Sequence, residues 1–498
     1  MGTEAGATVK AVWLRSEAAL VGVAAVAVLA LHLATNGLYD FHRDSLYYLD
    51  SARHPAWGYV DYPPVTPMIA RLSLALFGSS VWGLRLWPSL AGAMMVVLAA
   101  LIARELGGGR AARLLAALGA ATSLVLLGAN WLFQTVTFDQ LVWMTCLWIA
   151  ARLLRTGDHW LWIALGALIG IGLETKYTVV ALIIGLIAGT LLTPFRRQLV
   201  TPWPWIAAAI AFAIFLPNLV WQIGNDWPSV QYTLNHKVTQ SSDFSPLSFL
   251  ANQLALIGPV AIPIWIAGLA WLLRSPTLRM LGIAAAVPFV LYLFVGKDYY
   301  VGPLHPFLIA AGACALEAWT ANKRRWLRPT AGVALTAQAL ILLPVALPVL
   351  PEAAMAKSKL PAVRKDFADT VGWHDLVGQV AQVYDSLSPP DRSRAAILTD
   401  NYGEAGAINT YGPALGLPTA VSGQLTYYYW RPRSFDGPVI AVGLDRSFLE
   451  TLFATCDQVG TISNSYGLQN EEFGAPIDVC RTRLLSQDEL WSRLKAFR

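Results

Sequence analysis

The sequence has 498 residues, of which 56% are hydrophobic and 13% charged, and its mean hydropathy is +0.50. In soluble globular proteins about a quarter of the residues are charged, so this composition excludes that class and indicates a polytopic membrane protein. The net charge of +5 is scattered over loops and forms no basic patch, which argues against a nucleic-acid partner.

Eleven apolar segments have about the 17–25 residues that a helix needs to cross the bilayer core. They lie at roughly 17–35, 82–103, 111–129, 136–154, 159–174, 177–194, 204–222, 249–273, 280–296, 302–320 and 328–349. The first segment lacks a small-residue cleavage site before a soluble chain, so we interpret it as a retained helix and not as a signal peptide. The shorter segment 68–76 carries Arg71, which favours an interfacial helix that closes a first outward loop at 36–81.

The lysine and arginine residues of the short loops predict the orientation. Fifteen of them fall on the side of the N-terminus and seven on the other side. The N-terminus is therefore expected in the cytoplasm, and an odd number of spans places the C-terminus outside. We expect a multi-pass membrane protein with its C-terminal domain on the outer side.

The chain changes character after about residue 351, because charges become frequent and apolar runs shorten to strand length. Strands are predicted at 395–399 and 439–442, and helical spacing is found at 376–387 and 448–453. The expected fold is an α-helical polytopic membrane domain at 1–351 followed by a soluble α/β domain at 352–498.

Four cysteines divide into two pairs. Cys146 and Cys314 fall inside predicted spans and are expected to be packing residues. Cys456 and Cys480 fall in the outward domain, an oxidising place where they can form a disulfide. Two buried thiols are the alternative, because spacing alone does not establish the geometry.

Polar residues gather at the ends of spans that face outward. The densest block is 39–64, and Asp139, Glu174, Lys176 and Lys297 lie at the same predicted membrane face. An ionised side chain costs several kcal/mol in hydrocarbon, so such groups are expected to line a water-accessible cavity. Acids there can accept a proton, and cations can bind a phosphate.

Several short motifs resemble a known superfamily. The strings are DSLYY at 44–48, RHPAWGYVDYPP at 53–64, TVTFDQ at 135–140, GLETKY at 172–177, KDYYVGP at 297–303 and NYGEAGA at 401–407. Together they resemble the dolichyl-phosphate-mannose protein mannosyltransferase-like superfamily, whose bacterial members include aminoarabinose transferases acting on lipid A. The block at 44–64 is the most specific part. The superfamily usually carries Asp-Glu where this chain has Asp44 and Ser45, which leaves the contribution of the second carboxylate in doubt.

This resemblance implies the GT-C architecture and an inverting transfer of a sugar from a polyprenyl-phosphate donor. Asp44 is then the candidate general base. Lys176 and Lys297 are the candidates for the donor phosphate, with Arg53 as a further candidate. The remaining candidates for substrate contact are Tyr300, His54, Asp61, Asp139 and His305.

Structural explanations stand beside these roles. Asp44 can be a solvated acid paired with an arginine, and Lys297 can extend its amine to the membrane interface. Asp61 can position the following Pro63-Pro64 turn, and Asp139 can cap its helix. His54 and His305 can be structural. No metal-ligand spacing is present, so metal dependence stays open, and no cofactor is implied.

Two functions from other classes remain alternatives. A transporter or flippase of a lipid-linked saccharide would place ionisable groups near the bilayer midplane and would carry internal repeats, neither of which is evident. In a non-catalytic envelope assembly protein, the polar block around Asp44 would have no function. The acceptor can be a glycolipid, a polysaccharide or a protein, and the sequence does not identify the sugar.

Overall fold

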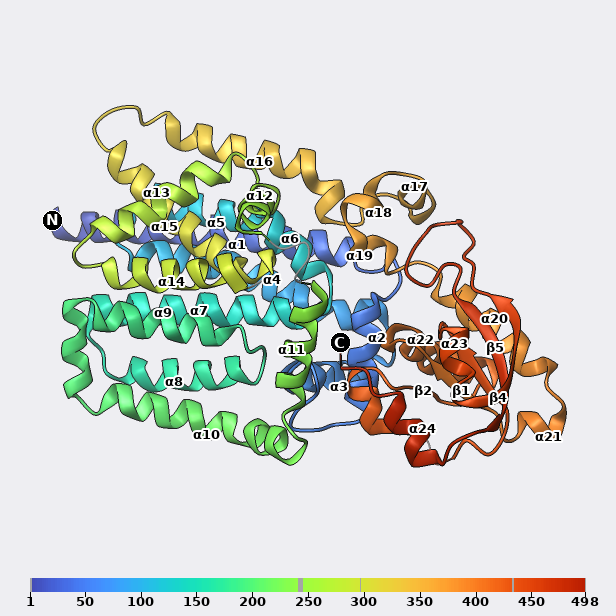
Figure 1. Cartoon of the computed structure of the whole chain (residues 1–498). Coiled ribbons are helices and arrows are strands. Elements are labelled where there is room, and N and C mark those ends of the chain that lie inside the picture. The colour runs from blue at the N-terminus through green and yellow to red at the C-terminus, as the bar shows by residue number, and fades with distance from the viewer. Residues whose placement is uncertain (1, 241–244, 296, 432–433, 498) are drawn as a thin grey trace. The chain divides into compact units, whose positions relative to one another are not determined.

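In the computed structural model, which describes residues 2–240, 245–295, 297–431 and 434–497, helices dominate the chain as far as Ala346, and the described strands all follow it (Figure 1). The chain divides into two compact units. The first comprises Met1–Asn36, Arg85–Leu219 and Asp243–Leu347, and the second Gly37–Leu84, Val220–Ser242 and Pro348–Arg498. The units cut across the linear division expected at residue 351, which stays a prediction.

The first unit is built from apolar helices. Wholly or mostly in it lie α1 (Gly2–Thr35), α4 (Val81–Glu105), α5 (Arg110–Ala121), α6 (Leu124–Trp131), α7 (Thr135–Thr156), α8 (Trp160–Leu173), α9 (Val179–Leu191), α10 (Trp203–Gly224), α12 (Pro246–Ile257), α13 (Ala261–Arg274), α14 (Arg279–Val295), α15 (Leu304–Trp319) and α16 (Leu327–Ala346), with the 3-10 helices η1 (Pro194–Val200) and η2 (Asp298–Val301).

Glycines let some of these helices pack backbone to backbone. A Cβ atom at Gly268 of α13 would lie 2.2 Å from the carbonyl oxygen of Leu308 in α15. A Cβ at Gly312 of α15 would lie 2.0 Å from the carbonyl oxygen of Ile264 in α13. Small residues are typical of such contacts in membranes, where close packing drives association.

Every segment predicted to span the membrane is covered by a helix or by a pair of helices. By length and composition, four of the described helices can cross a membrane, or up to seven when each bent pair is one span. The protein is therefore polytopic, and the count of eleven stays a prediction. Three residues that entered the charge bias have side chains outside the described part of the chain: Lys10, Arg15 and Lys237.

The segment expected as a first outward loop is largely helical in the structure. It holds α2 (Arg43–Arg53) and α3 (Val65–Phe77). Buried side chains along α2 stabilise a helix within the polar block. The place of the whole segment 36–81 outside the membrane stays a prediction. The other helices of the second unit are α11 (Pro228–Gln240), α17 (Glu352–Ala356), α18 (Leu360–Val363), α19 (Lys365–Ala368), α20 (Trp373–Ser386), α21 (Pro389–Arg392), α22 (Tyr402–Tyr411), α23 (Arg446–Leu449) and α24 (Gln487–Arg493), with the 3-10 helices η3 (Gly412–Leu415) and η4 (Leu425–Trp430).

A five-stranded sheet forms the core of the C-terminal segment. Its strands are β1 (Ala396–Thr399), β2 (Ala420–Ser422), β3 (Val439–Val442), β4 (Phe453–Thr461) and β5 (Pro476–Arg483), in the spatial order β2-β1-β3-β5-β4. The first three are parallel, and β5 and β4 are antiparallel to their neighbours. Strands β1 and β3 confirm the two predicted strands, and α20 confirms the predicted helix. The helix expected at 448–453 is wrong in its second half, because α23 ends at Leu449 and Phe453 opens β4.

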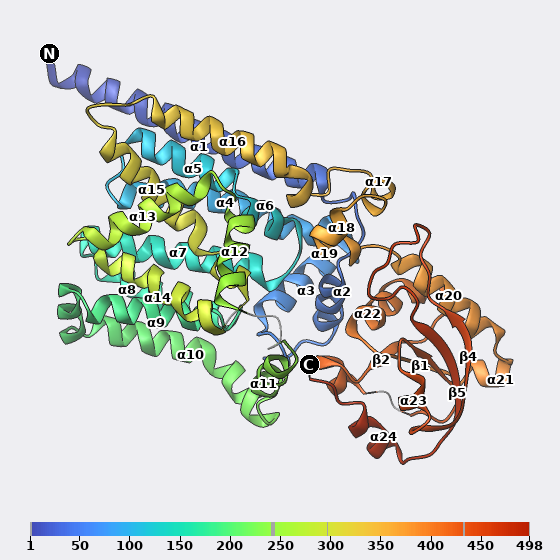
Figure 2. The ribbon, with the colours of Figure 1, turned by 45° about the horizontal axis from the view of Figure 1, so that its top comes forward.

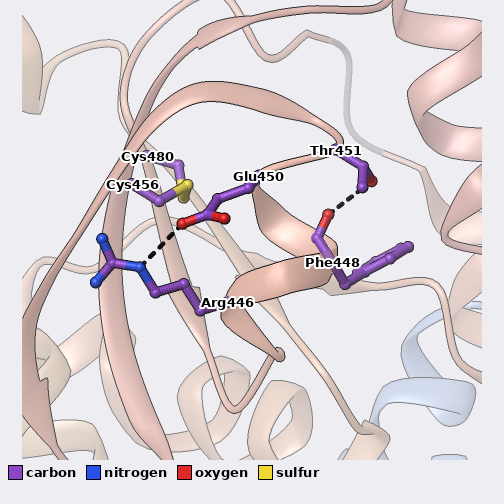
Figure 3. The surroundings of a disulfide bond; sticks show 6 residues. All are labelled: Arg446, Phe448, Glu450, Thr451, Cys456 and Cys480. Carbon is purple, nitrogen blue, oxygen red and sulfur yellow. Dashed lines mark hydrogen bonds and ion pairs between the residues drawn. A yellow bond between two sulfur atoms is a disulfide. The ribbon is translucent and has the colours of Figure 1, made fainter.

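A disulfide joins Cys456 of β4 to Cys480 of β5, next to α23 (Figure 3). The two residues face each other in the antiparallel register, with Cα atoms 4.1 Å apart. This pairing decides between the two alternatives that the sequence left open. Cys146 and Cys314 are buried free thiols, as expected of packing residues.

Candidate active site

Asp44 lies in the first turn of α2, in the second unit. His42 is the N-cap of this helix: its backbone is extended, and its Nδ1 accepts the backbone N–H of Asp44 at 3.2 Å. The partial positive charge of a helix N-terminus favours an acid at this position. The Asp44 side chain is 35% exposed. Its carboxylate is therefore held by regular structure and still accessible to a substrate.

Tyr402 donates its phenolic hydrogen to Oδ1 of Asp44 at 2.8 Å. The same ring lies under the guanidinium of Arg43, 5.0 Å from ring centroid to Cζ. Tyr402 opens α22, whose N-terminus is closed by a capping box between Asn401 and Glu404. The hydroxyl that contacts Asp44 is thus placed by a capped, buried helix and not by a loop.

Two glycines allow α22 to approach α2. A Cβ at Gly406 would lie 2.8 Å from the Cβ of Leu46, and a Cβ at Gly403 would lie 3.2 Å from the Cβ of Arg43. These glycines are three residues apart and share one face of α22. Any larger residue at Gly406 would push the helices apart and move Tyr402 relative to Asp44.

Asp61 supplies a second carboxyl group. Its Oδ1 accepts the hydroxyl of Tyr47 at 2.9 Å, and Tyr47 in turn accepts the backbone N–H of Thr426 at 3.0 Å. Burial raises the pKa of Asp61 to about 7. The hydrogen bond from Tyr47 lowers this pKa, and the negative charge of Asp44 raises it further. Near neutral pH, Asp61 is therefore protonated in part of the molecules.

Asp50 anchors the other end of α2. It is 1% exposed, forms an ion pair with Arg53, and accepts hydrogen bonds from Tyr427 at 2.5 Å and Asn409 at 2.7 Å. Arg53 is therefore occupied by a buried carboxylate, which favours a structural role over the expected phosphate contact. His54 closes the helix as its C-cap.

The ring of His54 stacks on Trp430 at 4.5 Å between centroids, and its Nδ1 lies 2.9 Å from the carbonyl oxygen of Asp50. These contacts agree with the structural alternative for His54. A substrate role for this residue stays a prediction.

His42 lies close to Asp44 and to two further acids. Its Nε2 lies 3.6 Å from Asp369 and 3.8 Å from Asp366. Burial by itself lowers the pKa of His42, but the hydrogen bond to Asp369 and the negative charges of Asp44 and Asp366 outweigh it and raise the pKa above the ordinary value. The Nδ1 of His42 lies 4.0 Å from Oδ2 of Asp44.

A separate polar cluster lies in the first unit, around Lys176. Its Nζ sits over two aromatic rings, 5.1 Å from the centroid of Tyr300 and 5.4 Å from that of Tyr299. Such contacts hold a cation without neutralising it. Lys297 is the N-cap of η2, and its carbonyl accepts the backbone N–H of Tyr300 at 3.1 Å. Both predicted phosphate-binding lysines are thus linked to Tyr300.

Asp139 is buried in α7, and both of its oxygens accept hydrogen bonds, from Trp143 at 3.0 Å and Thr178 at 2.7 Å. It lies beyond the N-cap, Gln134, so helix capping does not explain it. Its electrostatic interaction with Lys176 connects it to the lysine cluster.

His305 is fully buried in α15, and its ring centroid lies 6.1 Å from that of Trp265. Within the described residues its two ring nitrogens have no hydrogen-bond partner. This setting is that of a packed core residue of the first unit.

Sequence reasoning missed three members of the Asp44 cluster: His42, Asp50 and Tyr402. Tyr402 was noted only as part of the NYGEAGA string, and the glycine spacing in that string was the available signal. For metals, the described part of the chain contains no group of three or more His, Cys, Asp and Glu side chains that could hold an ion.

Comparison with known proteins gives two kinds of match. The family model of dolichyl-phosphate-mannose-protein mannosyltransferases matches residues 61–221, a stretch that includes Asp61, Asp139 and Lys176. A crystal structure of ArnT from Cupriavidus metallidurans bound to undecaprenyl phosphate matches with a TM-score of 0.59 and 16% identity, over 94% of this chain and 98% of that one. The apo structure of the same protein gives 0.57 and 16%, over 95% and 98%. No curated protein sequence matches.

The chain therefore has the GT-C fold of a multi-pass membrane protein with a C-terminal soluble sheet, as the sequence predicted. The family match at residues 61–221 and this fold both agree with the resemblance to the mannosyltransferase-like superfamily.

Proposed function

We propose that the protein transfers a sugar, with inversion, from a polyprenyl-phosphate-linked donor to an acceptor hydroxyl of the cell envelope. Support for the donor class comes from the solved relative, which is described as bound to undecaprenyl phosphate. The proposed setting is the outer face of a bacterial inner membrane, with the N-terminus in the cytoplasm and the C-terminal domain in the periplasm. A glycolipid, a polysaccharide and a protein all remain acceptors compatible with this chemistry.

The observation that carries the proposal is the carboxylate of Asp44, which is accessible and held by Tyr402 at 2.8 Å. As general base, Asp44 takes the proton of the acceptor hydroxyl while the hydroxyl oxygen bonds to the anomeric carbon. The bond between that carbon and the phosphate oxygen breaks, and polyprenyl phosphate leaves with the electron pair. Inversion at the anomeric carbon follows from this single displacement.

Lys176 is the proposed partner of the departing phosphate, with Lys297 as a second cation. A cation held over aromatic rings keeps its charge, and an ammonium stabilises the negative charge that develops on the leaving oxygen. The ring of Tyr300 lies under the ammonium of Lys176 and is proposed to orient it. Asp139 is proposed to position Lys176 through its charge.

Tyr402 is proposed as a positioning residue that aims the carboxylate of Asp44. Asp61, whose pKa near 7 keeps it partly protonated, limits the negative charge around the base. This proposal gives the C-terminal segment a part in the reaction, because Tyr402 belongs to α22.

Mass spectrometry of envelope glycans tests the proposed function. Extracts from cells with the wild-type gene, without the gene and with Asp44→Asn are compared for one sugar-modified species. We expect this species only with the wild type, and a rise of unconsumed lipid-linked sugar in the other two strains. Identical extracts would refute a transferase. A lipid-linked sugar that changes only its membrane side would support the transporter alternative.

A further inference from the structure

In the first unit, α5 and α16 pack together (Figure 2). A groove of about 750 Å³ runs between them. Apolar side chains line most of it, including Leu115 and Leu118 of α5 and Val333 and Leu340 of α16. One end of the groove is polar, because Arg325 and Arg328 line it there. The groove thus combines a hydrocarbon-like wall with two guanidinium groups at one end.

The length of the groove matches one leaflet of a bilayer. Arg328 and Leu340 are twelve residues apart on one helix, which at 1.5 Å per residue spans about 18 Å. Half of a hydrocarbon core of about 30 Å is about 15 Å. Val333 and Leu340 are 70% and 66% exposed, as expected of side chains that face lipid.

Exposed tryptophans lie beside the arginines in the sequence. Trp319 and Trp326 flank the turn that contains Arg325 and are 65% and 63% exposed. Exposed tryptophans at helix ends are typical of the membrane–water interface. The loop at this end is one of those that the charge bias predicts to be cytoplasmic.

Both guanidinium groups donate hydrogen bonds to nearby residues, and the acceptors are neutral. Arg328 donates to the hydroxyl of Thr320 at 2.7 Å and to the carbonyl oxygen of Glu317 at 2.9 Å, and Arg325 donates to the carbonyl oxygen of Ala321 at 3.0 Å. The Glu317 carboxylate instead accepts backbone N–H groups at the start of α5, at Gly109 and Ala111. Among the described residues, no carboxylate forms an ion pair with either arginine.

We infer that this groove binds an anionic phospholipid, with one acyl chain between α5 and α16 and the phosphate group at Arg325 and Arg328. Guanidinium groups bind phosphate oxygens by paired, charge-assisted hydrogen bonds. Basic pockets between helices on the cytoplasmic side are suited to acidic headgroups. This site is distinct from the proposed transfer reaction and does not depend on it.

The test is native mass spectrometry of the delipidated full-length protein, titrated with phosphatidylglycerol or phosphatidylethanolamine of identical acyl chains. Both lipids carry a phosphate, but the ammonium of phosphatidylethanolamine neutralises it. Each basic residue near a membrane surface contributes about fivefold in affinity, so we expect a preference for phosphatidylglycerol of about 30-fold.

Matched variants separate the site from general surface charge. Arg325→Gln, at an exposed position, should lower the preference about fivefold, and adding Arg328→Gln should abolish it. The control pair Arg274→Gln and Arg279→Gln removes two charges from another loop and should change nothing.

Ala337→Phe tests the groove itself. Ala337 is exposed and lines the groove, so a phenylalanine there fills the space of the acyl chain without disturbing the core. We expect weaker binding of both lipids at this site. Equal binding of both lipids by the wild type, equal losses in the control pair, or unchanged binding in Ala337→Phe would each overturn the inference.

Discussion

The role of Asp44 is best tested by removing its charge while keeping its shape. Asparagine has the same size, and its carbonyl oxygen can still accept the hydrogen bond that Tyr402 donates at 2.8 Å. The structural loss is confined to a charge in the first turn of α2, worth about 0.3–1 kcal/mol. The melting temperature should therefore fall by only a few degrees at most, by roughly 2–4 °C per kcal/mol. Loss of a general base lowers the rate by about 10²–10⁴-fold.

A double-mutant cycle then separates positioning from folding. Tyr402→Phe removes the hydroxyl and keeps the ring over Arg43, and a misplaced base costs up to about 10²-fold in rate. In the background of Asp44→Asn the same change should cost little more, because groups that act as a unit are non-additive. Tyr384→Phe is the matched control, since it removes a hydroxyl that donates to the carbonyl oxygen of Arg392.

The assay measures polyprenyl phosphate released from a lipid-linked sugar by the purified protein in proteoliposomes that contain an envelope extract as acceptor. Turnover by Asp44→Asn within a few-fold of the wild type would refute its role as base. Equal losses from Tyr402→Phe with and without Asp44 would refute the positioning role of Tyr402, and show a structural one.

Four further predictions concern other parts of the chain. Lys297→Ala and Lys176→Ala should raise the apparent donor KM as well as lower kcat, because a cation pairs with phosphate in ground and transition states alike; unchanged donor titrations would move the phosphate site elsewhere. The pKa of Asp61 is about 7 in the folded state and near 3.8 in the unfolded state, so the folded protein binds this proton more tightly. The free energy of unfolding should therefore fall as pH rises from about 4 to 7, and in thermal melts Asp61→Asn should reduce this fall. Reduction of the bond between Cys456 and Cys480, which are separated by 24 in sequence, should remove about 3 kcal/mol of stability from the sheet, visible as earlier unfolding under reducing conditions. A reporter fused to the C-terminus should be active only if it works outside the cytoplasm, and a cytoplasmic signal would mean an even number of spans.

The contacts of Arg53 and Asp61 bear on the substrate-binding roles predicted for them, and these roles stay predictions. Arg53 was considered for the donor phosphate, but it forms an ion pair with the buried Asp50. The Arg53 side chain is 33% exposed, and without it the buried Asp50 carboxylate would keep its hydrogen bonds from Tyr427 and Asn409. Asp61 was considered for substrate contact, with the following turn as the structural alternative, and burial raises its pKa to about 7.

The sequence by itself determined the class of the protein and the position of its main segments. Three local patterns carried this information: apolar runs of bilayer length, short β-branched runs at β1 and β3, and the polar block with Asp44. Each pattern depends directly on whether its segment lies in lipid, in a protein core or in water. The likeness of residues 44–64 to a known superfamily rests on the same local strings, and the family match supports it.

Only the tertiary structure decided which groups meet. Tyr402 reaches Asp44 across 358 residues of sequence because Gly403 and Gly406 let α22 touch α2, and no local pattern records that contact. The same holds for the pairing of Cys456 with Cys480, which requires the register of β4 against β5. Helix periods and strand alternation depend on neighbours along the chain, whereas burial, pKa and hydrogen bonding depend on neighbours in space.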